Sequence, residues 1–187
     1  YSIIFTLFCI VVFINSFNMF DGINLQASTY SFFLIIIFII YMNTSIFFII
    51  LLIFISSFKY LNFKNKTFLG DSGSLLISFI ISYIFIKLYN ENIINYSDDI
   101  FIYMLIPGID MIRLFFVRIL MNKSPFSDDR MHIHHLLLSK LTYSKSLIII
   151  NLLILFPISL KYFVDGNVFI ILLTITCYSG IIIKIKN

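Results

Sequence analysis

The chain has 187 residues, of which 60% are hydrophobic and 12% are charged, and its formal net charge is +4. Soluble domains of this length carry about 25% charged residues, so the composition excludes a water-soluble globular fold and predicts a protein embedded in lipid. The basic residues fall in short clusters beside apolar runs and do not form one soluble patch. This pattern argues against nucleic-acid binding and is typical of juxtamembrane loops.

Long apolar segments predict an all-α fold, a polytopic transmembrane helix bundle with about seven spans. Helices are expected because they satisfy their own backbone hydrogen bonds in lipid, and no segment alternates with a period of two residues. The chain begins with Tyr1 inside the first apolar run, so we expect a fragment of a larger bundle. The segments are 1–15, 24–42, 45–63, 73–89, 100–120, 146–163 and 168–185.

The boundary between the second and third segments depends on Asn43-Thr44-Ser45, which interrupts an uncharged run from Ser28 to Phe58. We interpret this triplet as a turn between two helices. The alternative, a single long tilted helix, would be far too long for the bilayer.

The basic residues also predict the orientation of the bundle. With seven spans, the loops near 16–23, 64–72 and 121–145 and the C-terminus face one side of the membrane, and most Lys and Arg residues lie on or near that side. Loops rich in Lys and Arg stay in the cytoplasm, so we expect this face to be cytoplasmic.

The first polar cluster, residues 15–24, reads NSFNMFDGIN and follows the first apolar segment. Asn18 and Asp21 are three residues apart and would share one side of a helical turn. Their amide and carboxylate oxygens are hard ligands suited to Mg²⁺. The alternative explanation is a helix end, in which Asp21 caps the next helix and Gly22 lies in the turn.

The second polar cluster, residues 68–74, reads FLGDSGS and opens the fourth apolar segment. Its two glycines would let the backbone approach a ligand closely, and the N-terminus of a helix favours anions such as phosphate. Asp71 could join a bridging metal ion to that phosphate. The alternative is that Asp71 is a simple N-cap.

The third polar cluster, residues 124–135, reads SPFSDDRMHIHH and contains all three histidines of the chain. The histidines could ligate zinc, but no cysteine or nearby carboxylate completes an obvious tetrahedral set. We favour phosphate binding, in which the histidines donate hydrogen bonds and Arg130 adds a bidentate charge.

Two ionisable residues, Asp110 and Arg113, lie three residues apart inside the fifth apolar segment. Ionisable groups inside a membrane segment are costly and are usually functional or paired. A structural ion pair and a functional role explain these two residues equally well. Pro107-Gly108, just before them, is expected to kink or interrupt the helix.

The three clusters, in this order and between these spans, resemble the polyprenyl-phosphate N-acetylhexosamine-1-phosphate transferases (glycosyltransferase family 4). That family includes enzymes that start lipid-linked cell-surface polysaccharides and the phospho-N-acetylmuramoyl-pentapeptide transferase of peptidoglycan synthesis. The His-Ile-His-His string after Ser-Pro-Phe looks most like the undecaprenyl-phosphate N-acetylglucosamine branch that initiates O-antigen or teichoic acid. The resemblance covers nearly the whole chain, as a single transmembrane transferase domain over 1–187, but only the C-terminal part of the family's fold.

The resemblance implies a Mg²⁺-dependent transfer in which the phosphate of a polyprenyl lipid attacks the sugar-linked phosphate of a UDP-N-acetylhexosamine and UMP leaves. It implies that Asp71 is the leading metal ligand and Asn18 its companion, with Asp21 close by in the substrate site. Phe68 matches a position expected to stack on uracil. The loop that holds the pyrophosphate or the sugar is matched by Ser124, Arg130 and the catalytic candidates His132, His134 and His135.

The resemblance further implies Mn²⁺ as an alternative cation, a bacterial inner (plasma) membrane location with a cytoplasmic active face, and it allows a homodimer. Two departures matter. Asn24 stands where the family has the acid of a second Asp-Gly, which bears on sugar recognition more than on metal binding. The family's paired aspartates on an early cytoplasmic loop are absent, because Asp98-Asp99 falls on the outer face. We expect that pair in a missing N-terminal part, and we expect this chain alone to be inactive.

Three other functions remain open from the sequence. One is an enzyme like the pentapeptide transferase. Another is a transporter or channel in which Asp110 and Arg113 line a path, although the polar residues gather in loops on one side and not at mid-membrane. The third is a non-catalytic or degenerate membrane relative, which the missing aspartate pair keeps open.

Overall fold

The structure is a computed structural model that describes residues 3–42, 46–125, 127 and 130–186. The described residues form eight α-helices and no β-strand, so the predicted all-α fold is confirmed. Seven helices correspond to the seven predicted segments, whereas α6 lies in a stretch that was predicted as loop. The helices are α1 (Ile3–Phe20), α2 (Gln26–Tyr41), α3 (Ile46–Phe63), α4 (Gly70–Asn90), α5 (Ser97–Leu120), α6 (Ile133–Lys140), α7 (Tyr143–Leu160) and α8 (Asn167–Lys186).

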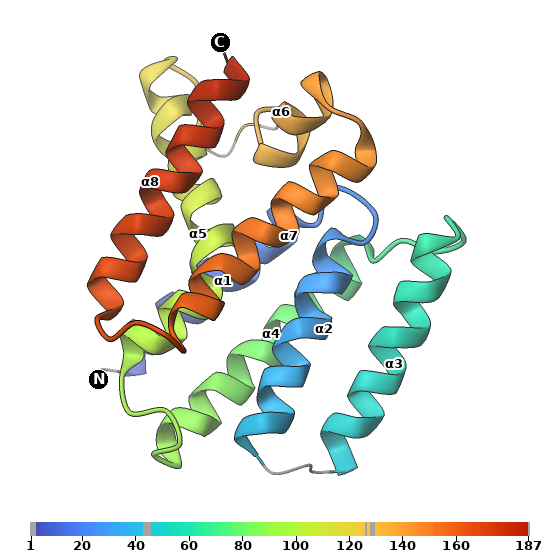
Figure 1. The fold of residues 1–187 in the computed structure, drawn as a ribbon, viewed down its shortest axis with the longest axis vertical. Helices are drawn as coiled ribbons and strands as arrows, with labels where there is room; N and C mark the ends of the chain where they lie inside the picture. Colours follow the sequence, from blue (N-terminus) through green and yellow to red (C-terminus); the bar gives the residue numbers. More distant parts are fainter. Residues whose placement is uncertain (1–2, 43–45, 126, 128–129, 187) are drawn as a thin grey trace. The chain divides into compact units, whose positions relative to one another are not determined.

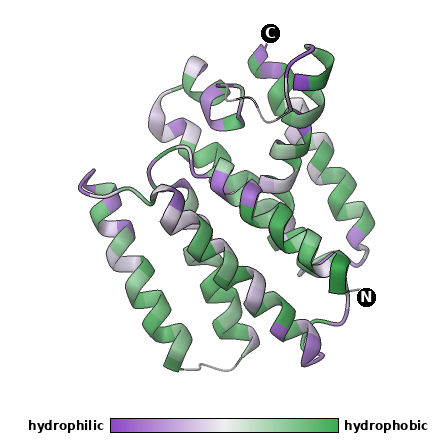
Figure 2. Ribbon diagram, turned by 180° about the vertical axis from the view of Figure 1, so that it is seen from behind, coloured by the Kyte–Doolittle hydropathy of each residue, from purple (hydrophilic) through white to green (hydrophobic). Residues whose placement is uncertain are grey.

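Six of these helices, α1, α3, α4, α5, α7 and α8, are long and apolar enough to cross a membrane. The other predicted span, α2, has 16 residues. Its rise of about 24 Å is less than the hydrocarbon thickness of about 30 Å. Figure 2 shows hydrophobic residues along the helices and hydrophilic residues gathered in loops and at helix ends. Large apolar side chains are exposed on helix surfaces, as at Phe54 with 70% exposure. The protein is therefore a helical membrane bundle.

The chain divides into two compact units, residues 1–100 and 101–187. In the first unit, α1 packs against α4, and α2 packs against α1, α3 and α4 (Figure 1). Tyr30 of α2 stacks on Phe17 of α1 with ring centroids 5.7 Å apart. Further along α2, Phe38 meets Phe85 of α4 edge to face at 4.9 Å. These buried rings make α2 the centre of the first unit.

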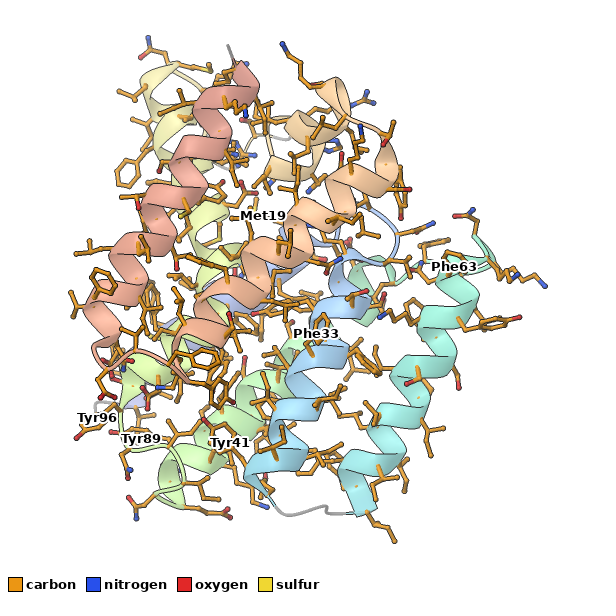
Figure 3. The ribbon with its side chains drawn as sticks, in the orientation of Figure 1. Met19, Phe33, Tyr41, Phe63, Tyr89 and Tyr96 are labelled. Carbon is orange, nitrogen blue, oxygen red and sulfur yellow. The ribbon has the colours of Figure 1, made fainter. Side chains whose placement is uncertain are left out.

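The second and third predicted spans are separate helices. α2 ends at Tyr41, α3 begins at Ile46, and the two lie side by side, which excludes the single long helix. The predicted turn at Asn43-Thr44-Ser45 lies outside the described residues. Because α2 and α3 run in opposite directions, the loops before α2 and after α3 lie at the same end of the unit. Met19 and Phe63 mark that end in Figure 3, and Tyr41 marks the other.

An asparagine lies two residues after the end of three of the long helices. Asn65, Asn92 and Asn122, which follow α3, α4 and α5, each have a left-handed backbone with φ 54°. After each of them, a backbone N–H returns to a carbonyl of the last helical turn, for example from Lys66 to Leu61 at 3.0 Å. This is the hydrogen-bond pattern of a left-handed C-terminal cap, which asparagine tolerates better than most residues.

In the second unit, α6 packs against α7 and α8, and α7 packs against α8. The end of α8 lies at the same end of this unit as α6 (Figure 1). α5 continues through Pro107 without a break. Of the two predicted effects of Pro107-Gly108, a kink or an interruption, the interruption does not occur. Membrane helices tolerate an internal proline where neighbouring groups satisfy the freed backbone. The unbroken helix carries Asp110 into the buried part of the unit.

Candidate active site

In the first unit, a candidate site lies where α1 ends and α4 begins. Ser74, in the first turns of α4, donates a hydrogen bond from its hydroxyl to Asn18 Oδ1 on α1. Asp21 directly follows α1, and its carboxylate is close enough to Asp71 in the first turn of α4 for the two charges to repel. The structure thus brings Asn18, Asp21 and Asp71 together, and we call these three residues the α1–α4 cluster.

The two acidic residues of this cluster are not helix caps. α2 begins at Gln26 after Leu25, so Asp21 is too far upstream to be its N-cap. Asp71 lies inside the first turn of α4, whose N-cap is Leu69. No capping hydrogen bond from a side chain is found at either N-cap. Capping therefore does not explain why these carboxylates lie together.

The electrostatics of the α1–α4 cluster fit a divalent cation. Burial, and then the negative charge of Asp71, raise the pKa of Asp21 to about 6. A cation between two repelling carboxylates would remove this cost. Two carboxylates and one amide supply the hard oxygen ligands that Mg²⁺ prefers. Among the described residues, no group of three or more His, Cys, Asp or Glu side chains is placed to hold a metal ion.

An asparagine network, formed by Asn24, Asn62 and Asn65, joins the loop after α1 to the loop after α3. Asn62 is 4% exposed. Its Oδ1 accepts the Leu25 N–H at 2.6 Å, and its Nδ2 donates to Asn24 Oδ1 at 3.1 Å and to the Thr67 carbonyl at 2.8 Å. Asn24 Nδ2 donates to Asn65 Oδ1 at 2.8 Å. The network therefore fixes the spacing of the two loops that flank the α1–α4 cluster.

Asn24 occupies the position where the resemblance leads us to expect an acidic residue, and the structure shows what its side chain does there. The side chain of Asn24 hydrogen-bonds to Asn62 and Asn65 of the asparagine network, so it ties the loop after α1 to the end of α3 and the loop that follows. The next residue, Leu25, has a left-handed backbone with φ 69°. Glycine follows the acid in the family's second Asp-Gly, and a side chain in this conformation costs about 1–2 kcal/mol relative to glycine. The Asn62 side chain, which binds the Leu25 N–H, helps to hold this conformation.

The turn into α4 depends on glycine. Gly70 has φ 63°, a conformation that side chains disfavour. A Cβ atom on Gly73 would lie 2.9 Å from Leu69 Cδ1, so the side chain of Leu69 would have to shift. Phe68, just before the turn, is 82% exposed. Its ring is accessible for stacking, as the predicted uracil role requires, and that role stays a prediction.

A separate polar site lies in the second unit, around the buried carboxylate of Asp110. Tyr178 Oη and Arg113 Nη2 donate to Asp110 Oδ1 at 2.5 and 2.8 Å. His132 Nδ1 lies 2.9 Å from Asp110 Oδ2, and the Ile133 N–H points to both oxygens at 3.3 and 3.4 Å. Arg113 Nε also donates to Tyr178 Oη at 2.8 Å. We call Asp110, Arg113, His132 and Tyr178 the Asp110 network.

Sequence reasoning found only part of this network. Asp110 and Arg113 form the ion pair that was one of two explanations for them, but the pair also reaches His132 of the third polar cluster. Tyr178 lies in an apolar segment 68 residues from Asp110 and belongs to no motif. Nothing in the sequence distinguished it from the other tyrosines. Asn62 was missed for the same reason, because a single asparagine near the end of an apolar run carries no recognisable pattern.

The three histidines lie against one another at the start of α6. The rings of His132 and His134 are nearly parallel, with centroids 5.6 Å apart, and those of His134 and His135 are 4.3 Å apart. Burial, and then its histidine neighbours, lower the pKa of His134 to about 3, so this ring is neutral at pH 7. Its Nδ1 is buried with no hydrogen-bond partner among the described residues. Binding of phosphate by His134 would therefore rest on a hydrogen bond and not on charge.

The loop between α5 and α6 is anchored by a buried arginine. Arg118, in the last turn of α5, donates from Nη1 to the Pro125 carbonyl at 2.7 Å. Ser124 and Arg130 are exposed in this loop, and their predicted contacts with substrate stay predictions. The remaining residues of the motif fall partly outside the described part of the chain: Phe126, Asp128 and Asp129.

Comparison with known proteins finds similarity to one family over part of the chain. Residues 1–89 match the model of glycosyl transferase family 4. A Yersinia pestis protein named undecaprenyl-phosphate alpha-N-acetylglucosaminyl 1-phosphate transferase is 32% identical over 151 residues, which cover 74% of this chain and 41% of the relative. Proteins of the same name from Haemophilus influenzae and Pasteurella multocida are each 40% identical, over 40% of this chain and 21% of the relative. No solved structure matches.

The family resemblance predicted from the three motifs is thus confirmed, at modest identity over part of the chain. The chain spans less than half the length of the curated relatives it matches. The matched family segment, residues 1–89, contains the whole α1–α4 cluster and the asparagine network.

Proposed function

We propose that this protein, whose residues 1–89 match glycosyl transferase family 4, transfers N-acetylglucosamine-1-phosphate from a UDP-sugar to undecaprenyl phosphate and releases UMP. The α1–α4 cluster carries the proposal, because repelling carboxylates and an amide oxygen lie together at one end of the first unit. The transfer would be the first step of a cell-envelope polysaccharide, in a bacterial inner membrane. The basic residues of the loops after α3 and α5 support a cytoplasmic active face.

Asn18, Asp21 and Asp71 would hold Mg²⁺, with Mn²⁺ as the alternative ion. When bound, the cation neutralises charge on the pyrophosphate of the donor, which is the main demand of phosphoryl transfer. The hydrogen bond from Ser74 orients the Asn18 amide. The asparagine network holds the acidic loops at a fixed spacing, so the oxygen ligands are in place before a cation arrives.

The exposed ring of Phe68 would stack on the uracil of the donor. In the second unit, the histidine segment would bind phosphate oxygens. Arg130 would add a charge-assisted, bidentate contact, and the neutral His134 would add a single N–H. Ser124, exposed in the same loop, offers a hydroxyl.

A transferase assay on the purified full-length protein tests this proposal. The assay contains radiolabelled UDP-N-acetylglucosamine, undecaprenyl phosphate and Mg²⁺, with and without chelator. We expect label in the lipid fraction and one UMP for each lipid-linked sugar, with both lost on chelation and regained when Mg²⁺ is restored.

Parallel reactions with UDP-N-acetylgalactosamine and with the UDP-linked muramoyl pentapeptide identify the sugar. Faster transfer from the pentapeptide donor would assign the protein to the other branch of the family. A folded protein that makes no lipid-linked product from any of these donors would refute the proposed function.

A further inference from the structure

A single buried carboxylate connects the histidine segment of the second unit to two membrane helices. Asp110 on α5 and Tyr178 on α8 are 2% and 1% exposed. The two carboxylate oxygens have different partners. Oδ1 accepts hydrogen bonds from Tyr178 and Arg113, whereas Oδ2 lies 2.9 Å from His132 Nδ1. Two donors from different helices therefore hold Oδ1 of Asp110, and Oδ2 points to the imidazole ring of His132.

This arrangement selects one tautomer of His132. A carboxylate that receives hydrogen bonds from a hydroxyl and a guanidinium acts as an acceptor, so the contact with His132 requires the proton on Nδ1. In the neutral ring, Nε2 then carries the lone pair and is the nitrogen able to accept a proton. When the ring is charged, Nε2 is able to donate a hydrogen bond to a phosphate oxygen. Buried carboxylates orient imidazoles in this way in other enzymes.

The carboxylate also contributes to the docking of α6. The Ile133 N–H, at the start of α6 where backbone donors have no partner within the helix, donates to Asp110. A negative charge at the N-terminus of a helix is favourable. Loss of Asp110 would therefore disturb the fold as well as the imidazole, and a test must separate these two effects.

We propose that Asp110 is a positioning residue that holds His132 in its Nδ1-protonated tautomer and presents Nε2 for the transfer, while Tyr178 and Arg113 fix the orientation of the carboxylate. A role of His132 Nε2 in the transfer rests on the proposed function. The tautomer of His132 does not depend on that function, because it is measured independently of activity.

The substitution Asp110→Asn tests the tautomer. Tyr178 and Arg113 both donate hydrogen bonds, so the amide oxygen of the asparagine faces them and its NH₂ group faces His132. The NH₂ group then donates to Nδ1, and the ring proton moves to Nε2. The substitution is close in size to the native side chain and is expected to reverse the tautomer.

Solid-state NMR of the ¹⁵N-histidine-labelled full-length protein in lipid measures the result, and a His132→Gln sample identifies the His132 signals. We expect a protonated Nδ1 and an unprotonated Nε2 on the neutral His132 ring of the native protein, and the reverse in Asp110→Asn. A native His132 with its proton on Nε2 would overturn the proposal, as would identical His132 signals in the two proteins. The native spectrum decides the question even if Asp110→Asn does not fold.

Activity supplies the second measurement. We expect Asp110→Asn to lower kcat by about 10²–10⁴-fold, the range of acid–base contributions, with little change in KM for the UDP-sugar. Tyr178→Phe keeps the tautomer but removes one of the two anchors, so it should lower kcat by a smaller factor. Thr174→Val is the matched control, because Thr174 is a buried hydroxyl on the same helix that donates to the Ile170 carbonyl.

The failures of the two proposals are distinguishable. A native protein with the expected tautomer but no transferase activity would refute the proposed function and leave the positioning of His132 intact. Active protein in which Asp110→Asn reverses the tautomer and leaves kcat unchanged would show that Nε2 has no part in the transfer. Equal losses of kcat in Tyr178→Phe and Thr174→Val would refute the anchoring role of Tyr178.

Discussion

Replacing Asp21 by asparagine should stabilise the protein at pH 8 when no divalent cation is present. The pKa of Asp21 rises from its ordinary value of 3.8 to about 6 because the carboxyl is partly buried and faces Asp71. Above pH 6 the folded protein must hold a carboxylate that its surroundings disfavour. Asparagine has nearly the same shape and carries no charge, so it removes this cost.

The expected size follows from the pKa of Asp21. At about 1.4 kcal/mol for each pH unit, a fully buried carboxyl with this pKa would cost the folded state about 3 kcal/mol at pH 8. Asp21 is only half-buried, and solvent screening reduces the cost to about 1–2 kcal/mol. For a protein of this length, that difference corresponds to a rise in Tm of about 2–8 °C.

The pH dependence has a definite sign. Because the folded pKa lies above the unfolded one, the native protein gains stability as pH falls from above 6 toward 3.8. The advantage of Asp21→Asn should therefore be complete at pH 8 and absent near pH 4. Thermal unfolding in detergent with chelator, measured across this range, gives the difference in Tm between native protein and variant.

Asp165→Asn is the control, because Asp165 is exposed in the loop between α7 and α8. Its Tm should follow the native protein at every pH. Adding Mg²⁺ at pH 8 should raise the Tm of the native protein more than that of Asp21→Asn, since only the native protein offers both carboxylates. A variant with a lower Tm than the native protein at pH 8 with chelator would refute this electrostatic reasoning.

Three further substitutions test the same region. Asp71→Asn should abolish transferase turnover, because an amide cannot replace the carboxylate charge at a metal; near-native turnover would contradict the assignment. Asn62→Ala should lower the free energy of unfolding by about 1–2 kcal/mol, because the partly buried Leu25 N–H and Thr67 carbonyl lose their partner. Thermal unfolding of the exposed control Asn90→Ala should not change. Gly70→Ala should cost about 1–2 kcal/mol from its left-handed backbone, and Gly108→Ala, which meets no atom within 4 Å, should not destabilise.

The long helices were predictable because burial in lipid demands continuous apolar runs. The exceptions have local causes. α2 begins at Gln26 and not at 24, because the asparagine network and the left-handed Leu25 hold residues 21–25 in a turn. α6 was missed because it has only eight residues and its stability depends on packing against α7 and α8 and on the charge of Asp110.

The candidate site was predictable only where residues form a motif. Asn18, Asp21 and Asp71 lie in short polar strings that resemble a known family, and the structure brings them together. The residues that support the site could not be found in this way. Asn62 reaches Leu25 across 37 positions, and Tyr178 reaches Asp110 across 68. Such contacts arise from helix packing, and a single sequence without its fold does not record them.

Cation binding at the α1–α4 cluster is the most direct test of its role. Electron paramagnetic resonance of Mn²⁺ titrated into the full-length protein in lipid measures the affinity without requiring turnover. We expect one tight Mn²⁺ site that Mg²⁺ displaces, at least tenfold weaker in Asp71→Asn and unchanged in Asp165→Asn. Equal Mn²⁺ affinity in the native protein and Asp71→Asn would contradict the assignment of this cluster as the cation site.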